Sequence, residues 1–542
     1  MAMGRSLRTA LVTALLICAP FAGSYAADEK QSLEELRNTV INLLQALVDQ
    51  GVISREKAAQ LVKAAQDKAA ADASAVAKAD EGAVRVPYVP QIVKDEIAKQ
   101  VADQIKPGVV ADVVKEAKTE RWGVPGALDE FFSRVHFSGG VTLREEDILF
   151  AKDNLQFFYP NYQAINSAGS IAKAPLNGFL ETDINRARFR GRARFGLEAD
   201  ITNSVTAGIR FSTGTLSGDP VSQTQTLDGT AAFQTGLDQL YIRLDERNAQ
   251  KFPWLSVVGG RFANPWQAPT DLIFHKDLMF NGVSATGRIG FGDGSAEQSH
   301  AFITAGVHPL QEIQLSSRDK MLVGGQVGAN LRWGAGQRLR IAGAFYDYLN
   351  VTGRRNSIDA PGFLNYTAPA FIRQGNTYFD ISADPTTSNL FALASKFRLI
   401  DVNMIYELPL GRYTFKATSD AVKNVGYRSE DITANLGVPI EARTKGYQAE
   451  LSFGYPNVST AGFGAWRALM GYRYLQRDAV IDAYTDSDFH LGGTDATGYY
   501  FIGELGLANK LWMRLRYQSA NAIEDPKLYG VDTIQLDLNT RF

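Results

Sequence analysis

The chain has 542 residues, a formal net charge of -2, 45% hydrophobic residues and 11% aromatic residues. A chain of this length can bury a sizeable core. Its near-neutral charge provides no basic surface of the kind that nucleic acids select, which argues against a nucleic-acid partner.

Residues 1–26 predict a secretory signal peptide, because Arg5 and Arg8 precede an apolar run that small residues follow. The single cysteine, Cys18, lies in this segment, so the mature chain could form no disulfide. A lipidated Cys18 is the alternative, although Ile17 stands where lipoprotein signals carry a small residue. The following sequence has no run of ~18 apolar residues that could form a membrane helix, so a mature chain in a membrane must be a barrel.

Residues 27–125 predict a small α-helical domain with a linker. Apolar residues at alternating spacings of three and four lie on one helical face, namely Leu33, Leu36, Val40, Leu43 and Leu47. Gly51 ends this helix and a second apolar stripe follows it. The stripes fit either a small helical core or a short coiled coil between subunits, since the heptads are too few to decide.

Residues 126–542 predict an all-β transmembrane barrel of about 16 antiparallel strands. The period changes to two, as in GYQAELSFGY (446–455), where apolar residues alternate with polar residues and glycine. Sixteen such segments can be counted, among them 253–263, 391–406 and 496–508. An even count places both ends of a barrel on one side. Long and short connections alternate, as expected for extracellular loops and periplasmic turns.

An arginine ladder is the most unusual motif. In NRARFRGRARFG every second residue is an arginine: Arg186, Arg188, Arg190, Arg192 and Arg194. Period two places all five on one face of a strand. Facing lipid, each would cost ~2–4 kcal/mol near the bilayer midplane, so we expect them to face the lumen. The pattern recurs in pairs on other segments: Arg338 and Arg340, Lys396 and Arg398, Arg467 and Arg473, and Arg514 and Arg516.

The last segment, TIQLDLNTRF, alternates apolar with polar residues and ends on Phe542. It resembles the carboxy-terminal signal that the barrel-assembly machinery recognises in Gram-negative outer-membrane barrels, although Thr540 replaces the usual bulky apolar residue. The layout of signal peptide, helical segment with an LxxLVxxGVIS turn (44–54) and barrel resembles the putative porin family of Gram-negative outer membranes.

This resemblance implies an outer-membrane porin for passive diffusion of small hydrophilic solutes. Its implied partners are outer-membrane lipid, the barrel-assembly machinery and, by analogy with other sixteen-stranded porins, two further copies of the chain in a homotrimer. The helical domain would lie in the periplasm.

The ladder has two interpretations. A cationic wall attracts anions and would give the pore an anion preference, with Arg514 and Arg516 as further pore-lining residues. Alternatively, the arginines pair with lumenal acids such as Glu198, Asp238 or Glu450 and only hold the wall rigid.

The third long connection, residues 264–281, is aromatic and contains prolines. In sixteen-stranded porins the third external loop folds into the barrel and narrows it. Its candidate constriction residues are Asp271, His275, Lys276 and Asp277. An outward loop that packs its aromatic residues on the rim is the alternative.

An enzyme is not expected. The five histidines are scattered, and no nucleophile grouping, metal spacing or cofactor motif is recognisable. The alternative function is a plugged barrel that acts as a structural tether between the outer membrane and the periplasmic cell wall.

Overall fold

The structure is a computed structural model that describes residues 134–542, apart from 215–217, 222–223, 231, 293–294, 296, 315–316 and 526–528, and eight residues between 56 and 68. The chain divides into two units, Met1–Asp112 and Val113–Phe542. The eight described residues of the first unit are helical. The predicted signal peptide and the rest of the predicted helical domain lie outside the described residues. No helix of the described part is long and apolar enough to cross a membrane.

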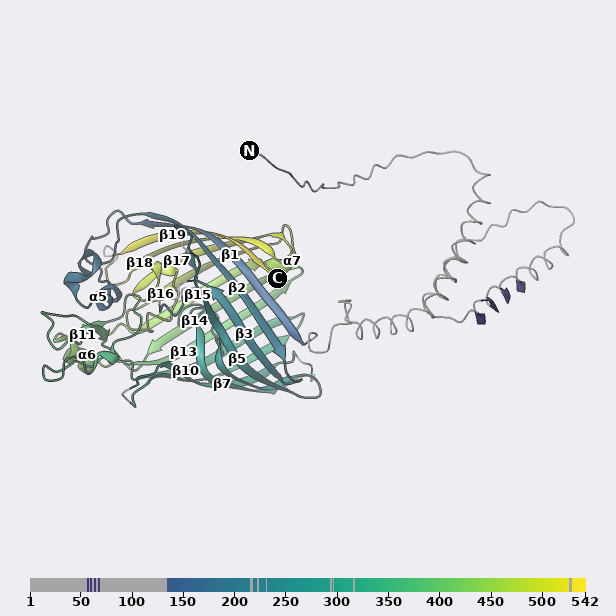
Figure 1. Ribbon diagram of the computed structural model, residues 1–542, viewed down its shortest axis with the longest axis horizontal. Coiled ribbons are helices and arrows are strands. Elements are labelled where there is room, and N and C mark those ends of the chain that lie inside the picture. Colours follow the sequence, from purple (N-terminus) through teal and green to yellow (C-terminus); the bar gives the residue numbers. More distant parts are fainter. Residues whose placement is uncertain are drawn as a thin grey trace, which may run out of the picture. The chain divides into compact units, whose positions relative to one another are not determined.

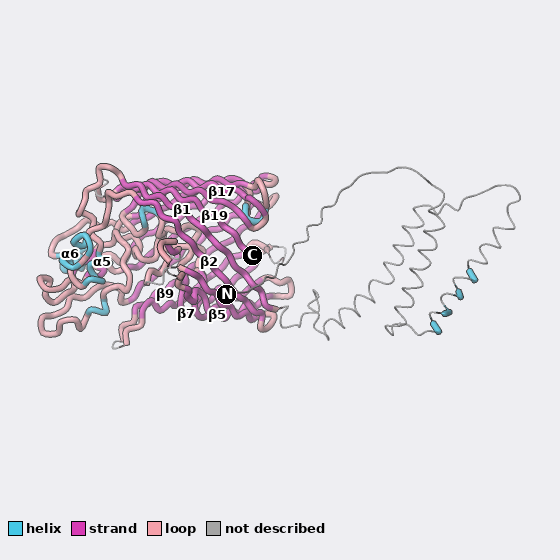
Figure 2. The backbone as a smooth tube through the Cα atoms, turned by 45° about the horizontal axis from the view of Figure 1, so that its top comes forward, coloured by secondary structure: helices cyan, strands magenta, loops and turns pink. Residues whose placement is uncertain are grey.

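Sixteen long strands form one antiparallel ring in the second unit (Figures 1 and 2). They are β1 (Val135–Phe150), β2 (Arg186–Asp200), β3 (Val205–Thr213), β5 (Thr235–Arg247), β6 (Pro253–Ala263), β7 (Met279–Gly290), β8 (His300–Gln311), β9 (Lys320–Trp333), β10 (Gln337–Leu349), β13 (Phe397–Leu410), β14 (Tyr413–Asn424), β15 (Lys445–Gly454), β16 (Trp466–Leu475), β17 (Ala496–Ala508), β18 (Leu511–Ala522) and β19 (Gly530–Arg541).

The ring is closed, because β1 pairs with both β2 and β19, and every neighbour along it is antiparallel. At the seam Gly140 lies opposite Arg541, and Gly139 and Phe542 exchange two backbone hydrogen bonds of 3.1 and 3.0 Å. The prediction of an antiparallel barrel of about 16 strands is therefore confirmed.

Shorter elements lie in the connections. They are the strand β4 (Gln225–Thr226) beside β2, the ribbon of β11 (Tyr378–Asp380) and β12 (Phe391–Leu393), the helices α5 (Tyr162–Ala168), α6 (Ser429–Leu436) and α7 (Val458–Ala461), and the 3-10 turns η1 (Ile171–Lys173), η2 (Pro175–Gly178), η3 (Asn365–Thr367) and η4 (Phe489–Leu491).

The two faces of the barrel wall differ as the period-two pattern predicts. In β15 the side chains of Tyr447 and Leu451 are exposed on the outer face, whereas Gln448 and Ser452 are buried on the inner face. In β19 Leu536 and Leu538 are exposed and Gln535 is buried. An apolar outer face and a polar interior are the arrangement of a barrel that sits in lipid.

Long and short connections lie at opposite ends of the barrel. Figure 1 shows α5, α6 and β11 at one end, and α7 and the C-terminal residue at the other. The long connections, numbered in chain order, include the third loop (264–278), the fifth loop (350–396) and the seventh loop (476–495). The turns are short, and that between β13 and β14 contains Gly411, whose φ of 64° suits glycine.

One predicted strand is wrong at its start. The segment 391–406 was expected to be one strand, but residues 391–393 pair with β11 in the fifth loop and β13 begins at Phe397. Residues 391–394 are apolar and largely buried among the loops, so the sequence does not mark where the loop ends and the strand begins. Arg398 is exposed on the outer face with Ile400 and Val402, so the Lys396 and Arg398 pair is not part of a lumenal ladder.

Candidate functional site

The third loop lies inside the barrel. Its Asp277 carboxylate accepts hydrogen bonds from Arg192 at 2.8 Å and Arg194 at 2.9 Å on β2. On the opposite wall, the Gln267 amide donates to Asn403 of β13 at 2.8 Å, and the Thr270 hydroxyl donates to Asp420 of β14 at 2.7 Å. A loop bonded to the inner faces of opposite walls must cross the lumen.

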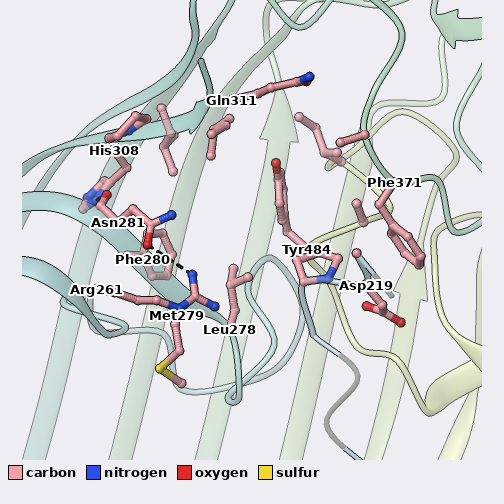
Figure 3. A pocket seen from close by; sticks show the side chains of 18 of the residues that line it. Asp219, Arg261, Leu278, Met279, Phe280, Asn281, His308, Gln311, Phe371 and Tyr484 are labelled. Carbon is pink, nitrogen blue, oxygen red and sulfur yellow. Dashed lines mark hydrogen bonds between the residues drawn. The ribbon is translucent and has the colours of Figure 1, made fainter. Parts of the chain in front are cut away.

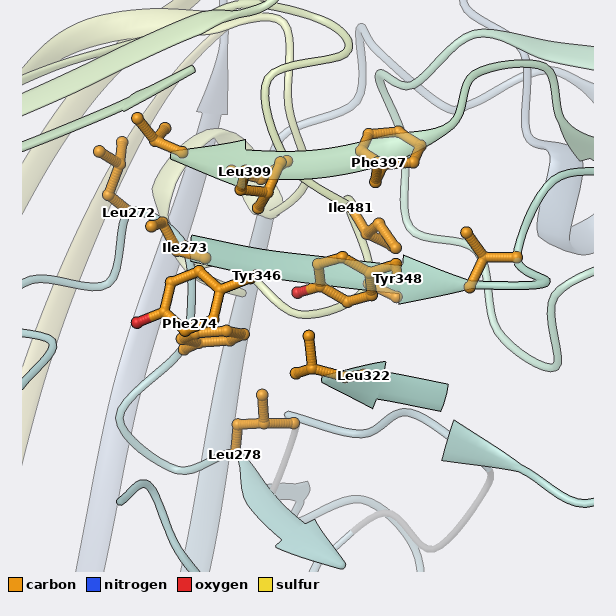
Figure 4. Packing of buried hydrophobic residues seen from close by; sticks show 14 of the residues in the cluster. Leu272, Ile273, Phe274, Leu278, Leu322, Tyr346, Tyr348, Phe397, Leu399 and Ile481 are labelled. Carbon is orange, nitrogen blue, oxygen red and sulfur yellow. The ribbon is translucent and has the colours of Figure 1, made fainter. Parts of the chain in front are cut away.

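Apolar side chains of this loop pack inside the barrel. Figure 4 shows Ile273 and Phe274 beside Tyr346 of β10, and the Phe274 and Tyr346 rings meet edge to face with centroids 5.1 Å apart. Leu272 and Phe274 are fully buried, and Ile481 of the seventh loop belongs to the same cluster. The third and seventh loops are also joined through the backbone, where the amide of His275 donates to the carbonyl of Tyr484 at 2.8 Å.

The arginine ladder lines the lumen across from this loop. Arg188 and Arg190 both bond to Glu146 of β1, and the Arg190 guanidinium also donates to the carbonyl of Thr224 at 3.0 Å. The Arg186 guanidinium lies 5.9 Å from the centre of the Phe150 ring. The side chains between them, such as Phe189, are exposed on the outer face.

Acidic partners neutralise part of the ladder. Glu146 is almost completely buried and lies within 4 Å of three guanidiniums, those of Arg144, Arg188 and Arg190. Asp238, which was expected as a partner, lies 3.7 Å from Arg194 and pairs with Arg210.

Two other expected acidic partners bond elsewhere. Glu198 accepts from the Tyr241 hydroxyl, and Glu450 accepts from Tyr500 at 2.6 Å. The described residues show no arginine paired with either carboxylate.

A cavity of about 280 Å³ lies between the ladder, the third loop and the seventh loop. Eight cationic side chains line it: Arg144, Arg186, Arg188, Arg190, Arg192, Lys276, Arg373 and Arg514. Among the described residues, four carboxylates line it: Glu146, Asp277, Asp488 and Asp537. The wall of this cavity therefore carries an excess of positive charge.

The remaining constriction candidates have different surroundings. Burial opposes ionisation of Asp271, but the Lys276 ammonium 3.6 Å away, Arg473 and the backbone N–H of Lys276 act together and lower its pKa to about 2. Burial lowers the pKa of His275, so this imidazole is neutral at pH 7 and adds no charge to the cavity. Burial opposes ionisation of Asp277, but Arg192 and Arg194 hold its pKa well below the usual range.

The seventh loop is bonded to the wall beside the ladder. Its Asp488 carboxylate accepts hydrogen bonds from Arg144 and Arg516, each at 3.1 Å. Burial would raise the pKa of Asp488, but these two guanidiniums hold it well below the usual range. The other predicted residue of this wall, Arg514, pairs with Glu504 at 2.7 Å.

A second, larger cavity of about 400 Å³ was not predicted. It lies beside the third loop, and its lining comes from β3, from β5 to β10, from the second loop between β3 and β5, and from the third, fifth and seventh loops. Figure 3 shows Leu278, Phe280, Phe371 and Tyr484 around it, and Arg261 donating to Asn281. No sequence motif joins these residues, because they are far apart along the chain.

Metal binding was not predicted for this chain. Within residues 134–542, as far as these are described, no three His, Cys, Asp or Glu side chains are grouped so that they could hold a metal ion.

Comparison with known families decides the identity of this barrel. A family model described as "Putative porin" matches residues 37–542. The chain belongs to this porin family. The match covers the whole barrel and confirms the resemblance seen in the sequence. Family and fold indicate a channel rather than an enzyme, and they support the outer membrane as the location.

Solved porin-like barrels are distant from this porin. OprB of Pseudomonas putida, in a high-pH structure, is 11% identical, with a TM-score of 0.43 over 78% of this chain and 97% of that chain. In vitro folded OmpT of Vibrio cholerae, in its trimer form, is 8% identical, with a TM-score of 0.38 over 75% and 99%. Salmonella typhi OmpF in complex with daunomycin is 10% identical, with a TM-score of 0.37 over 75% and 97%. No curated protein matches the chain.

Proposed function

We propose that this porin is a diffusion channel for small hydrophilic solutes that prefers anions. The observation that carries the proposal is the lining of the smaller cavity, where eight cationic side chains face four carboxylates. A cationic wall raises the local concentration of anions and lowers that of cations.

In this proposal the third loop forms the constriction. Asp277 binds the loop to Arg192 and Arg194, and Lys276 adds a positive charge at the same cavity. Arg186, Arg188 and Arg190 line the cavity beyond that contact. An anion would therefore pass between the ladder and the loop.

The proposal also includes the orientation and assembly of the chain. The long-loop end would face the exterior, and residues 27–125 would lie in the periplasm with the turn end. Phe542 would be read by the barrel-assembly machinery, and the apolar outer wall would contact lipid and two further copies of the chain. Cross-linking of native membranes that yields only monomer would contradict the trimer.

The test is single-channel conductance and reversal potential of the full mature protein in a planar bilayer under a salt gradient. We expect steady conductance and a reversal potential whose sign shows that anions are more permeant than cations. Changing Arg188, Arg190 and Arg192 together to Ser should move the reversal potential toward zero. An unchanged reversal potential in this variant would contradict the assigned role of the ladder.

One observation favours the second candidate, a plugged barrel that tethers the outer membrane to the cell wall. The third, fifth and seventh loops pack an apolar cluster inside the barrel, with Leu272, Ile372 and Ile481 among its members. A folded barrel that conducts nothing, together with an envelope defect when residues 27–125 are deleted, would favour the tether.

A further inference from the structure

The larger lumenal cavity combines an apolar wall with cationic groups. Its volume of about 400 Å³ lies in the range of small-molecule sites. Phe274, Phe280, Leu322, Tyr348 and Tyr484 all line it. The rings of Tyr348 and Tyr484 lie nearly parallel, with centroids 6.1 Å apart and an angle of 11° between them. An ion with a full hydration shell would gain nothing from such a wall, whereas an apolar ring or chain would be removed from water there.

Lys320 is the first cationic group of this cavity. Only 5% of the residue is exposed, and its ammonium donates to Gln311 at 2.9 Å and to the carbonyl of Ala368. An ammonium has three N–H donors, so one remains beyond these two bonds. Within the described residues no carboxylate lies within 4 Å of this ammonium.

Arg261 is the second cationic group. Its guanidinium donates to the carbonyl of Asp238 at 3.0 Å and to Asn281 at 3.1 Å, as Figure 3 shows for Asn281. Both partners are neutral groups. No ion pair of Arg261 with a carboxylate occurs in the part of the chain that the structure describes.

The carboxylates that line the cavity are already paired with other arginines. Asp219 pairs with Arg373 at 2.6 Å, and Asp238 pairs with Arg210 at 2.5 Å. The charge of the buried Lys320 is therefore not balanced within the cavity. A buried cation without a counter-ion is costly, and a bound anion would remove that cost.

From these contacts we infer that the larger cavity binds organic anions that join a carboxylate to an apolar ring or chain. The carboxylate lies at Lys320, and the apolar part lies against Tyr348, Tyr484 and Phe280. The inference rests on the proposed function, because it names the class of solute that a porin with this lumen would retain on its path. The smaller, charged cavity has no comparable apolar wall, so it would admit small inorganic anions as readily as organic ones.

The test uses benzoate as the probe, titrated calorimetrically into the full mature protein folded in detergent. We expect saturable binding of benzoate. Acetate carries the charge without the ring, and benzyl alcohol carries the ring without the charge, so both should bind at least tenfold more weakly. Absence of benzoate binding, or equal binding of acetate, would overturn the inference.

Three variants assign the site. Lys320→Met removes the charge and should weaken benzoate binding at least tenfold. Tyr484→Ala, in a loop, removes part of the apolar wall and should weaken benzoate binding while leaving acetate unaffected. Lys396→Met is the matched control, since this lysine is exposed and pairs with Asp431 at 3.1 Å outside the cavity; it should bind benzoate like the parent protein.

Heat-modifiability on gels verifies that each variant folds. If Lys320→Met does not fold, Tyr484→Ala decides the question, because wild-type affinity in that folded variant contradicts the site.

Bilayer recordings separate this inference from the proposed function. Benzoate should interrupt the current of the parent protein and have less effect on Lys320→Met. A protein that conducts but does not bind benzoate keeps the proposed function and refutes the inference. A protein that binds benzoate but never conducts refutes the proposed function and keeps the site.

Discussion

The Arg192 guanidinium donates to the Asp277 carboxylate at 2.8 Å, and this bond joins the ladder on the barrel wall to the loop that crosses the lumen. Arg194 binds the other oxygen of the same carboxylate at 2.9 Å. This one carboxylate therefore both fixes the third loop to the ladder and reduces the positive charge of the smaller cavity.

We expect Asp277→Asn to increase the anion preference and the conductance. One unit charge about 8 Å from a passing ion is worth about 0.5 kcal/mol in water, so the permeability ratio should rise by about twofold. The measurement is the reversal potential in a salt gradient. Asp245→Asn is the control, because it removes the same charge from an ion pair with Arg243 on β5, away from the third loop. Equal shifts in both variants would contradict the assignment of the constriction.

The packing of the seventh loop should weaken as the pH rises from about 4 to about 7. Burial raises the pKa of both Asp482 and Asp495 to about 7, above the ordinary 3.8. Between these two pKa values both carboxyls are protonated in the packed loop and ionised in the released loop. The free energy that favours the packed loop is therefore greatest below pH 4 and falls as the pH rises to about 7. Asp488 stays ionised throughout, because its pKa lies well below the usual range.

Hydrogen exchange measures this effect. After correction for intrinsic rates, amides 478–495 should open more at pH 8 than at pH 6. Asp482→Asn should reduce the difference. Protection that is the same at both pH values would show that these carboxyls do not control the loop.

Arg473→Leu should strongly destabilise the barrel. Arg473 is 1% exposed, donates to Gln448 at 2.7 Å and pairs with Asp486 at 3.3 Å. Leucine would leave a buried carboxylate unpaired, at a cost of about 3–5 kcal/mol. Arg398→Leu breaks an exposed pair with Asp347 and should cost no more than about 1 kcal/mol. Urea titration gives both unfolding free energies, and similar values would count against a structural role for Arg473.

Arginine on the outer face should hinder insertion in a depth-dependent manner. Val327 lies in the middle of β9 and is 58% exposed, whereas Leu410 is the last residue of β13. Val327→Arg should cost about 2–4 kcal/mol and Leu410→Arg about 0–1 kcal/mol. Folding free energies in lipid vesicles measure the difference. If Leu410→Arg cost as much as Val327→Arg, the lipid belt would have to be placed elsewhere on the wall.

The strands could be predicted from the sequence because apolar residues, which contact lipid, alternate with polar residues, which face the lumen. The predicted 253–263 and 496–508 coincide with β6 and β17. The same alternation placed five arginines on one face. It could not show where the fifth loop ends and β13 begins, since residues 391–393 are as apolar as a barrel strand although they are largely buried among the loops.

The larger cavity could not be predicted, because its residues come together only when loops fold back into the barrel. Lys320 begins a strand and Tyr484 lies in an acidic loop, so neither belongs to a recognisable motif. The ion-pair partners of the ladder arginines could not be predicted from the sequence either. Glu146 was not proposed as a partner of the ladder, although it lies opposite Arg188 in the register of β1 and β2.

The β1–β19 seam has a consequence for assembly. Thr142 and Asn539, which bond across it, are 397 positions apart in the chain, so this contact is far more non-local than any hairpin in the barrel. Contacts of such separation form slowly, and until this one forms, two strand edges stay open to pairing with other chains. A barrel whose ring is not yet closed is therefore most prone to aggregation. An assembly catalyst that covers the free edges of β1 and β19 would protect the chain at this step.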